Sequence, residues 1–254
     1  MLTPSPFLAP SAPDLVQATF DRHHGASVTP FASLNCSFGV GDQTEKVQTN
    51  RDMLKHSLGI NRLISAGQVH GHQILRIQET PDSDQEIDGI DALMTDKRGV
   101  GLMIQHADCQ AILLHDPVRS AIAAIHCGWR GSVIRIIEKT VRMMNACYQS
   151  RPEDILAGIS PSLGPCCAEF INHRQELPAS FLAFQQRRNY FDFWQISRSQ
   201  LMEAGLQPEK IRIAMICTCC SPDFFSYRRA SRKGDGITGR NCSIIALRDK
   251  AEIV

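Results

Sequence analysis

Two histidines and one cysteine stand where polar residues interrupt the ends of apolar stretches. His70 lies in QVHGH, Cys109 in HADCQ and His126 in IHCGWRG. Loops at strand ends commonly carry function, because they are exposed and yet anchored by a rigid sheet. Two imidazoles and one thiolate form a zinc site with three protein ligands and an open fourth position. The pattern therefore indicates a metal site, although spacings of 39 and 17 residues also suit side chains that never meet.

Asp108, next to Cys109, is the candidate catalytic carboxylate. Zinc lowers the pKa of a bound water to about 7, and zinc deaminases pair the resulting hydroxide with a carboxylate that moves protons. Alternatively, Asp108 orients a ligand histidine. If Asp108 and Cys109 belong to a regular strand, their side chains face opposite sides and Asp108 points away from the site.

A competing interpretation makes Cys109 a catalytic nucleophile and His126 its base, as in a cysteine hydrolase. A zinc-bound thiolate does not readily attack a substrate at the same time. Metal content therefore separates the two hypotheses. A protein that binds a metal or nucleotide without turnover is a third possibility, and it predicts stabilisation by ligand alone.

Three arginines are candidates for binding an anion. In HCGWRGSV, Gly128 and Gly131 permit a tight turn, and a helix starting near Gly131 would present free N–H groups beside Arg130. Solvation of Arg130 is the alternative. The basic segment FFSYRRASRKGDGITGR suits the phosphate or ribose of a small ligand, and its cationic residues are Arg228, Arg229, Arg232, Lys233 and Arg240. One short cluster in a chain of net charge +1 argues against nucleic acid as a partner.

Composition predicts a cytoplasmic protein without a membrane anchor, because no signal-like or membrane-length apolar segment is present. We expect its ten cysteines to be reduced. The sequence CTCC at Cys217–Cys220 and the pair CC at Cys166 and Cys167 resemble metal motifs. Neither has a second cysteine pair or a histidine at regular spacing, so structural thiol clusters are favoured.

Copper is the alternative to zinc. The chain has nine histidines and a single His-x-His pair, which is too few for a multicopper oxidase. A lone blue-copper centre stays open, because two histidines, a cysteine and a weak axial methionine form its ligand set, and Met103 is nearby in sequence.

The elements that must position these residues indicate an α+β fold. We expect a single mixed αβ domain over residues 1–254, with a central mixed β-sheet layered with helices and a flexible segment over residues 1–13. The apolar runs predict three strands beside the polar sites, and helical spacing predicts three helices. These elements are Val100–Ile104, Ala111–Leu114, Ala121–Ile125, Glu45–Leu58, Val133–Met144 and Ser197–Ala204.

Several motifs resemble, in order, those of the YfiH family of laccase-domain, polyphenol oxidase-like proteins. They are QVHG, DALMT, ADCQAILLHDP, HCGWRG, SPSLGPCC, FFSYRR and TGR. Matching positions imply that His70, Cys109 and His126 bind a metal, usually zinc, and that Arg228 and Arg240 are the residues of the basic segment that hold phosphate or ribose. Cys127 replaces the usual alanine and could compete for the metal, while Ala168 replaces an aromatic residue and could alter substrate preference.

The resemblance also implies an activity. Members of this family are similar to purine nucleoside phosphorylases acting on adenosine, inosine and methylthioadenosine, and they also show adenosine deaminase activity. The implied partners are purine nucleosides and phosphate, bound by a monomer or homodimer. Because the family fold is similar to that of a toxin deamidase, and some members resemble a peptidoglycan-precursor amidase, the cysteine hydrolase stays an alternative.

Overall fold

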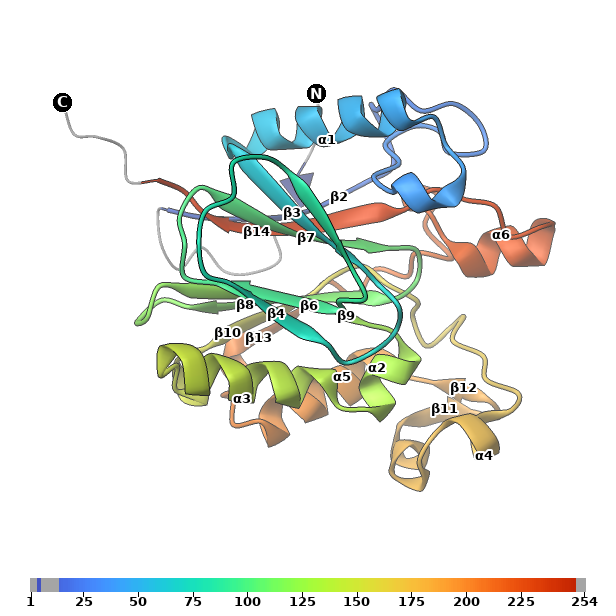
Figure 1. Ribbon diagram of the computed structural model, residues 1–254. Coiled ribbons are helices and arrows are strands. Elements are labelled where there is room, and N and C mark those ends of the chain that lie inside the picture. The colour runs from blue at the N-terminus through green and yellow to red at the C-terminus, as the bar shows by residue number, and fades with distance from the viewer. Residues whose placement is uncertain (1–3, 6–13, 250–254) are drawn as a thin grey trace.

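The computed structural model describes residues 4–5 and 14–249 of the chain. Two six-stranded sheets are stacked on one another, with helices on both outer faces (Figure 1). Both sheets mix parallel and antiparallel neighbours, which confirms the mixed αβ class while dividing the strands between two sheets. The flexibility expected of residues 1–13 lies outside the described residues, except at Pro4–Ser5, which form β1.

The first sheet has α1 (Thr44–Leu58) on its outer face, and the second sheet is covered by α3 (Ile136–Tyr148) and α5 (Phe193–Glu203) (Figure 1). In spatial order, the first sheet contains β1 (Pro4–Ser5), β2 (Leu15–Phe20), β14 (Asn241–Leu247), β7 (Val100–His106), β3 (Arg62–Gly67) and β5 (Gln85–Asp88). The second contains β13 (Ile211–Ile213), β10 (Leu156–Ile159), β8 (Gln110–Asp116), β9 (Ala121–Cys127), β6 (Ala92–Thr95) and β4 (Ile74–Ile77).

The strands β7, β8 and β9 are buried along their whole length, which explains their nearly continuous apolar sequence. Successive side chains serve different cores because they point to opposite faces. Leu102 and Ile104 pack between the two sheets, whereas Met103 packs with the residues of α1. The three strand predictions are confirmed: β7 ends and β8 begins at the polar group HADCQ, and β9 ends in IHCGWRG.

Two helices start earlier than the sequence predicts. The helix α5 begins at Phe193 rather than Ser197, because the Asp192 side chain accepts a 3.1 Å hydrogen bond from Gln195 N and caps its first turn. The short α2 (Trp129–Val133) begins before Gly131 and is separated from α3 by Arg135, whose φ is 58°. The stripe predicted as one helix is therefore broken near its start.

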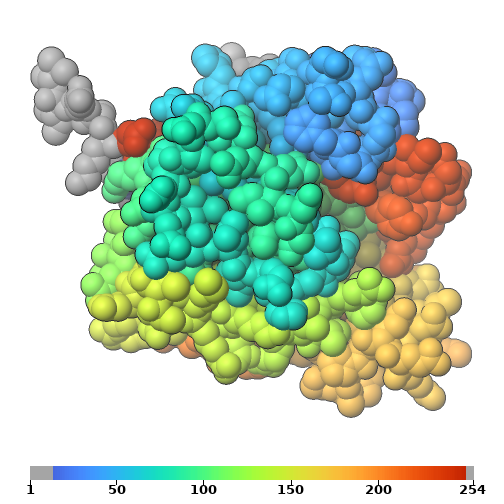
Figure 2. Space-filling model, in the orientation of Figure 1, coloured from blue at the N-terminus to red at the C-terminus, as the bar shows by residue number. Residues whose placement is uncertain are grey.

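A small lobe projects beside the stacked sheets (Figures 1 and 2). Its centre is an apolar cluster that includes Phe181, Phe191 and Phe193. The lobe contains α4 (His173–Glu176), η3 (Ala179–Phe184), β11 (Gln185–Arg187) and β12 (Tyr190–Phe191). The remaining elements are η1 (Phe38–Val40), η2 (Pro152–Asp154), η4 (Pro208–Lys210) and α6 (Tyr227–Lys233).

Among the described residues, no helix combines the length and the apolar character needed to cross a bilayer.

Candidate metal centre and its two cavities

His70, Cys109 and His126 lie together. His70 is in the loop between β3 and β4, Cys109 directly precedes β8, and His126 is near the end of β9. Their candidate ligand atoms all lie within 4.8 Å of one another, with 3.7 Å between Cys109 Sγ and His70 Nε2. The two imidazole rings are 4.7 Å apart at an interplanar angle of 80°. Three side chains remote in sequence therefore converge, and metal binding by them stays a prediction.

The carboxylate that orients this group is Asp91, directly before β6. One of its oxygens lies 2.8 Å from His126 Nδ1 and accepts a 2.9 Å hydrogen bond from His70 N. The other oxygen accepts a 2.7 Å bond from Gly71 N. Asp91 is completely buried and thus fixes one ring and the loop of the other histidine. Such hydrogen-bonded carboxylates orient the histidines of metal sites and raise their basicity.

The electrostatics of the group favour a thiolate facing an imidazolium when no metal is bound. Desolvation opposes ionisation of Cys109, but His126 and His70 outweigh it and lower the pKa of the thiol to about 6. Burial also opposes the charge on His126, but Cys109 and Asp91 raise the pKa of its ring to about 9. A thiolate is the form in which cysteine binds metals or attacks substrates. The lowered pKa of Cys109 therefore agrees both with a metal site and with a cysteine hydrolase.

Gly128 leaves space for the three side chains. A Cβ at this position would lie 2.8 Å from Cys109 Sγ and 3.2 Å from His70 Cδ2. The backbone of Gly128 is extended, with φ −77° and ψ −179°, so any residue could adopt its conformation. A glycine is therefore needed here for the close approach of the site.

Asp108 occupies a different position from the one expected of an orienting residue. Its φ of 91° turns the backbone between β7 and β8, so the alternation of a regular strand does not apply. Its carboxylate accepts hydrogen bonds of 2.7 Å from Thr218 Oγ1 and 2.5 Å from Arg228 N. Asp108 and Cys109 both line the same cavity. The orienting contact with His126 belongs to Asp91 instead.

The three predicted anion-binding arginines have different surroundings. Arg130 is exposed, its guanidinium lies 5.1 Å from the centre of the Trp129 ring, and it lines neither cavity at the site. The structure therefore gives no support for a phosphate site at Arg130, and that role stays a prediction. Arg228 donates to the carbonyls of Cys167 and Glu169 at 3.0 and 3.2 Å, which fixes a cavity wall.

Two cavities meet at His70 and Cys109. The aromatic cavity, of about 430 Å³, is lined by Trp129, Phe170 and Phe193 and by Asp108 and Arg228, among others. The polar cavity, of about 620 Å³, is lined by side chains that include Gln68, Glu86, Asp88, Gln105, His126 and Arg240. The candidate metal centre thus lies between two cavities, and the first of them has three aromatic rings in its wall. Cavities of this size suit a small-molecule ligand.

Arg240 is the arginine best placed to meet a ligand beside the centre. It lines the polar cavity, and burial lowers the pKa of its guanidinium. Its Nη1 donates to the backbone carbonyls of Thr238 and Gly239 at 2.9 and 3.2 Å, which holds the side chain in place. A held cation at a polar cavity is the arrangement that recognises phosphate or carboxylate groups.

The two departures from the family pattern lie away from the ligand atoms. Cys127 packs in the core beneath the second sheet, and its Sγ lies 3.4 Å from Ser132 Oγ. Burial raises the pKa of this thiol to about 12, which opposes competition for a metal. Ala168 is buried at the edge of the aromatic cavity, where Phe170 supplies an aromatic ring. Met103 packs toward α1 and is absent from both cavity linings, so the axial copper ligand considered for it is not supported.

Sequence reasoning missed Asp91 and Phe170. Asp91 begins the motif DALMT, and its position directly before an apolar strand resembles that of the other polar groups. That signal was available. Phe170 had none, because it follows the motif SPSLGPCC in a loop and reaches the cavity only through the packing of the lobe.

Comparison with known proteins gives a consistent result. Residues 16–248 match the family model described as multi-copper polyphenol oxidoreductase laccase. A purine nucleoside phosphorylase of Bacteroides thetaiotaomicron is 31% identical over 234 residues, covering 85% of this chain and 87% of the relative. The purine nucleoside phosphorylase YfiH of Shigella flexneri is 31% identical over 235 residues, covering 89% of this chain and 91% of the relative.

Solved structures share the fold. The crystal structure of YlmD from Geobacillus stearothermophilus has a TM-score of 0.83 and 31% identity, covering 95% of this chain and 94% of that chain. The crystal structure of the hypothetical protein YfiH from Bacillus licheniformis has a TM-score of 0.82 and 27% identity, covering 94% and 98%. The names of the relatives support an enzyme. The chain belongs to the YfiH family of laccase-like proteins.

Proposed function

We propose that this protein is a zinc-dependent purine nucleoside phosphorylase whose metal is held by His70, Cys109 and His126. The observation that carries the proposal is the position of these three residues where the aromatic and polar cavities meet. A nucleoside has a flat base, which stacks on aromatic rings, and a ribose with hydroxyl groups, so the aromatic cavity suits the base and the second cavity suits the ribose. The names of the relatives support the same reaction.

The donor set fits zinc. Zinc accepts imidazole and thiolate ligands, and three protein ligands leave one position for substrate or water. Asp91 completes the arrangement, because it accepts a hydrogen bond from His126 Nδ1 and leaves Nε2 for the metal. When bound, zinc would supply a Lewis acid that polarises an oxygen of the substrate. Copper is the alternative occupant, which the name of the family model favours and direct metal analysis decides.

The purine base would occupy the aromatic cavity. Trp129 and Phe170 are 6.2 Å apart and nearly perpendicular, and Phe170 lies 5.0 Å from Phe193. Stacking of a nucleobase on such rings contributes about 1–3 kcal/mol to binding and tolerates different bases. This tolerance agrees with adenosine, inosine and methylthioadenosine as alternative substrates.

Phosphate would enter from the polar cavity, where Arg240 holds it near the ribose. An oxygen of phosphate forms a bond to C1′ while the C1′–N9 bond breaks, and the electron pair of that bond stays on the purine. The purine then takes up a proton. Arg240 favours this step by holding the nucleophile in position, which can contribute several kcal/mol to a bimolecular reaction.

Adenosine deamination is the second activity we propose. It is favoured by Asp108, a carboxylate that lines the aromatic cavity next to Cys109 and is our candidate proton carrier. A cysteine hydrolase acting on a peptidoglycan precursor is the alternative reaction, and the lowered pKa of Cys109 favours it.

The experiment is to incubate the zinc-loaded protein with adenosine, with and without phosphate, and to separate the products by chromatography. We expect adenine and ribose 1-phosphate in equal amounts, formed only with phosphate, and a separate phosphate-independent yield of inosine from deamination. Arg240→Met should raise the KM for phosphate, whereas Arg130→Met is the matched control without effect. If adenosine is untouched while a peptidoglycan precursor is hydrolysed without metal, the proposal is wrong.

A further inference from the structure

We propose that Cys166, Cys167, Cys217 and Cys220 form a second metal site, which binds zinc as a tetrathiolate and is distinct from the histidine-containing centre. The four Sγ atoms all lie within 4.8 Å of one another. Four sulfurs each about 2.3 Å from a tetrahedral zinc lie about 3.8 Å apart. The measured separations of Cys220 Sγ from Cys166 Sγ and Cys167 Sγ are 3.6 and 3.5 Å.

The fold explains why two cysteine pairs separated in sequence come together. The strands β10 and β13 are parallel, and this pairing continues past their ends as a bridge between Ser162 and Cys217. Thr218 N donates to Ser162 O at 3.0 Å, so the two chain segments leave the sheet side by side. The motif CC at Cys166 and Cys167 has no second cysteine pair near it in the sequence, and the fold supplies that pair from the motif CTCC.

Each of the two cysteine pairs lies on a tight turn. Cys167 N donates to Gly164 O at 2.9 Å, and Cys220 N donates to Cys217 O at 3.2 Å. The spacing from Cys217 to Cys220 is the Cys-x-x-Cys spacing of structural zinc sites.

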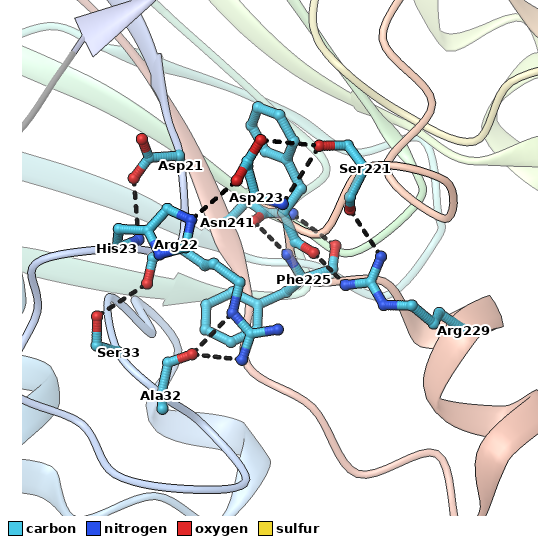
Figure 3. Close-up of polar contacts among 11 residues, drawn as sticks. Asp21, Arg22, His23, Ala32, Ser33, Ser221, Asp223, Phe225, Arg229 and Asn241 are labelled. Carbon is cyan, nitrogen blue, oxygen red and sulfur yellow. Dashed lines mark hydrogen bonds and ion pairs between the residues drawn. The ribbon is translucent and has the colours of Figure 1, made fainter.

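Hydrogen bonds from Arg229 hold the turn that contains Cys217 and Cys220. Arg229 Nη1 donates to the carbonyls of Thr218, Cys219 and Ser221 at 2.6, 3.2 and 2.8 Å, and the bond to Ser221 is drawn in Figure 3. The backbone of Phe225 is tied to the Asn241 side chain by two further 2.8 Å hydrogen bonds. The ligand turn is therefore ordered by contacts that do not depend on the metal.

The surroundings also suit the charge of the site. Four thiolates around Zn²⁺ carry a net charge of −2, which nearby cations stabilise. Arg232 Nη1 approaches Cys167 Sγ at 4.0 Å, and Arg187 Nη2 donates to Cys166 O at 3.3 Å. A disulfide is the competing state of these thiols. Its sulfurs would have to approach to about 2.05 Å, and all four cysteines are free here.

The metal would fasten two walls of the aromatic cavity. Ala168 and Phe170, which follow the first pair, line that cavity directly. Thr218, which follows Cys217, donates to the Asp108 carboxylate. A zinc bridging the two segments would fix the position of Phe170 relative to Asp108. Its role is structural, and it does not depend on which reaction the first centre catalyses.

Metal analysis of variants tests the proposal. Cys220→Ser changes an exposed ligand, and Cys219→Ser is the matched control in the same turn but outside the four-sulfur group. By elemental mass spectrometry, we expect Cys220→Ser to contain one zinc fewer per chain than the wild-type protein, and Cys219→Ser to contain the same amount. His70→Ala should lose the other zinc independently. Equal zinc content in the Cys220→Ser and wild-type proteins would overturn the proposal.

Alkylation of the wild-type protein tests it without any variant. Cys166 and Cys220 are exposed, so free thiols there are accessible to iodoacetamide at an alkaline pH, where thiols ionise. We expect peptide mass spectrometry to find both unmodified in the zinc-loaded protein and modified after a chelator removes the metal. Rapid alkylation of both in the loaded protein, or a disulfide between them, contradicts a metal site. Neither zinc content nor alkylation involves a nucleoside, so the second metal site can be confirmed even if the proposed phosphorylase reaction is not found.

Discussion

The substitution Gly128→Ala isolates the steric requirement of the candidate metal centre. The new Cβ would lie 2.8 Å from Cys109 Sγ, whereas nonbonded heavy atoms prefer about 3.5–4.0 Å. The sulfur must therefore move by about 1 Å, although metal–ligand distances tolerate only about ±0.2 Å. His70 Cδ2, at 3.2 Å from the Cβ, must also shift. Since the backbone at Gly128 is extended, the substitution introduces no conformational strain of its own.

We expect Gly128→Ala to weaken zinc binding by at least about 100-fold, at the upper end of the losses seen when the support of a metal ligand is removed. Competition with a chromophoric chelator measures this affinity. Gly131→Ala is the matched control, because its Cβ would meet Ile136 Cγ2 at 3.3 Å and the backbone oxygen of His126 at 3.5 Å, but no candidate ligand atom. If both variants bind zinc as tightly as the wild-type protein, the inferred geometry of the three ligands is wrong.

Three other substitutions test separate parts of the account. Asp91→Asn removes the charge that orients His126 and should weaken zinc binding about 10- to 100-fold in the same competition assay. Phe170→Ala should raise the KM for adenosine about tenfold and leave kcat nearly unchanged. The substitution removes stacking of about 1–3 kcal/mol that stabilises the bound substrate and the transition state equally. An unchanged KM in steady-state assays would mean that the base binds elsewhere. Burial, with repulsion from His126, lowers the pKa of His106 from 6.5 to about 3. Between pH 6.5 and 3 the unfolded chain therefore binds a proton at His106 that the folded chain excludes. The stability that neutral His106 contributes is complete above pH 6.5 and is lost as the pH falls toward 3. In urea titrations between about pH 4 and 6, the free energy of unfolding of His106→Gln should fall less steeply with decreasing pH than that of the wild-type protein, by up to about 1.4 kcal/mol per pH unit. Identical slopes of unfolding free energy against pH for the two proteins would contradict a buried neutral His106.

The elements around the site were predictable because their sequences depend on burial. Strands β7, β8 and β9 are apolar on both faces, and the only polar interruptions mark their ends. The helix predicted over Glu45–Leu58 is found over Thr44–Leu58 and ends at Gly59, whose φ of 64° stops the helix.

What the sequence did not reveal depends on contacts between segments remote in the chain. The division of the strands into two sheets follows from pairings such as β14 with β7, which no local pattern encodes. The helix that was expected to start near Gly131 starts two residues earlier, at Trp129, and Arg130 in its first turn is exposed. The pairing of Cys166 with Cys220 likewise follows from two parallel strands meeting, and not from the spacing within either motif.

The most direct test of the central claim is to follow the zinc-loaded protein with adenosine and phosphate by phosphorus NMR. A signal of ribose 1-phosphate should grow in step with adenine, and should be lost in a His126→Ala variant that remains folded by circular dichroism. Adenosine consumption without any new phosphate ester would contradict the account, as would undiminished ester formation by the His126→Ala variant.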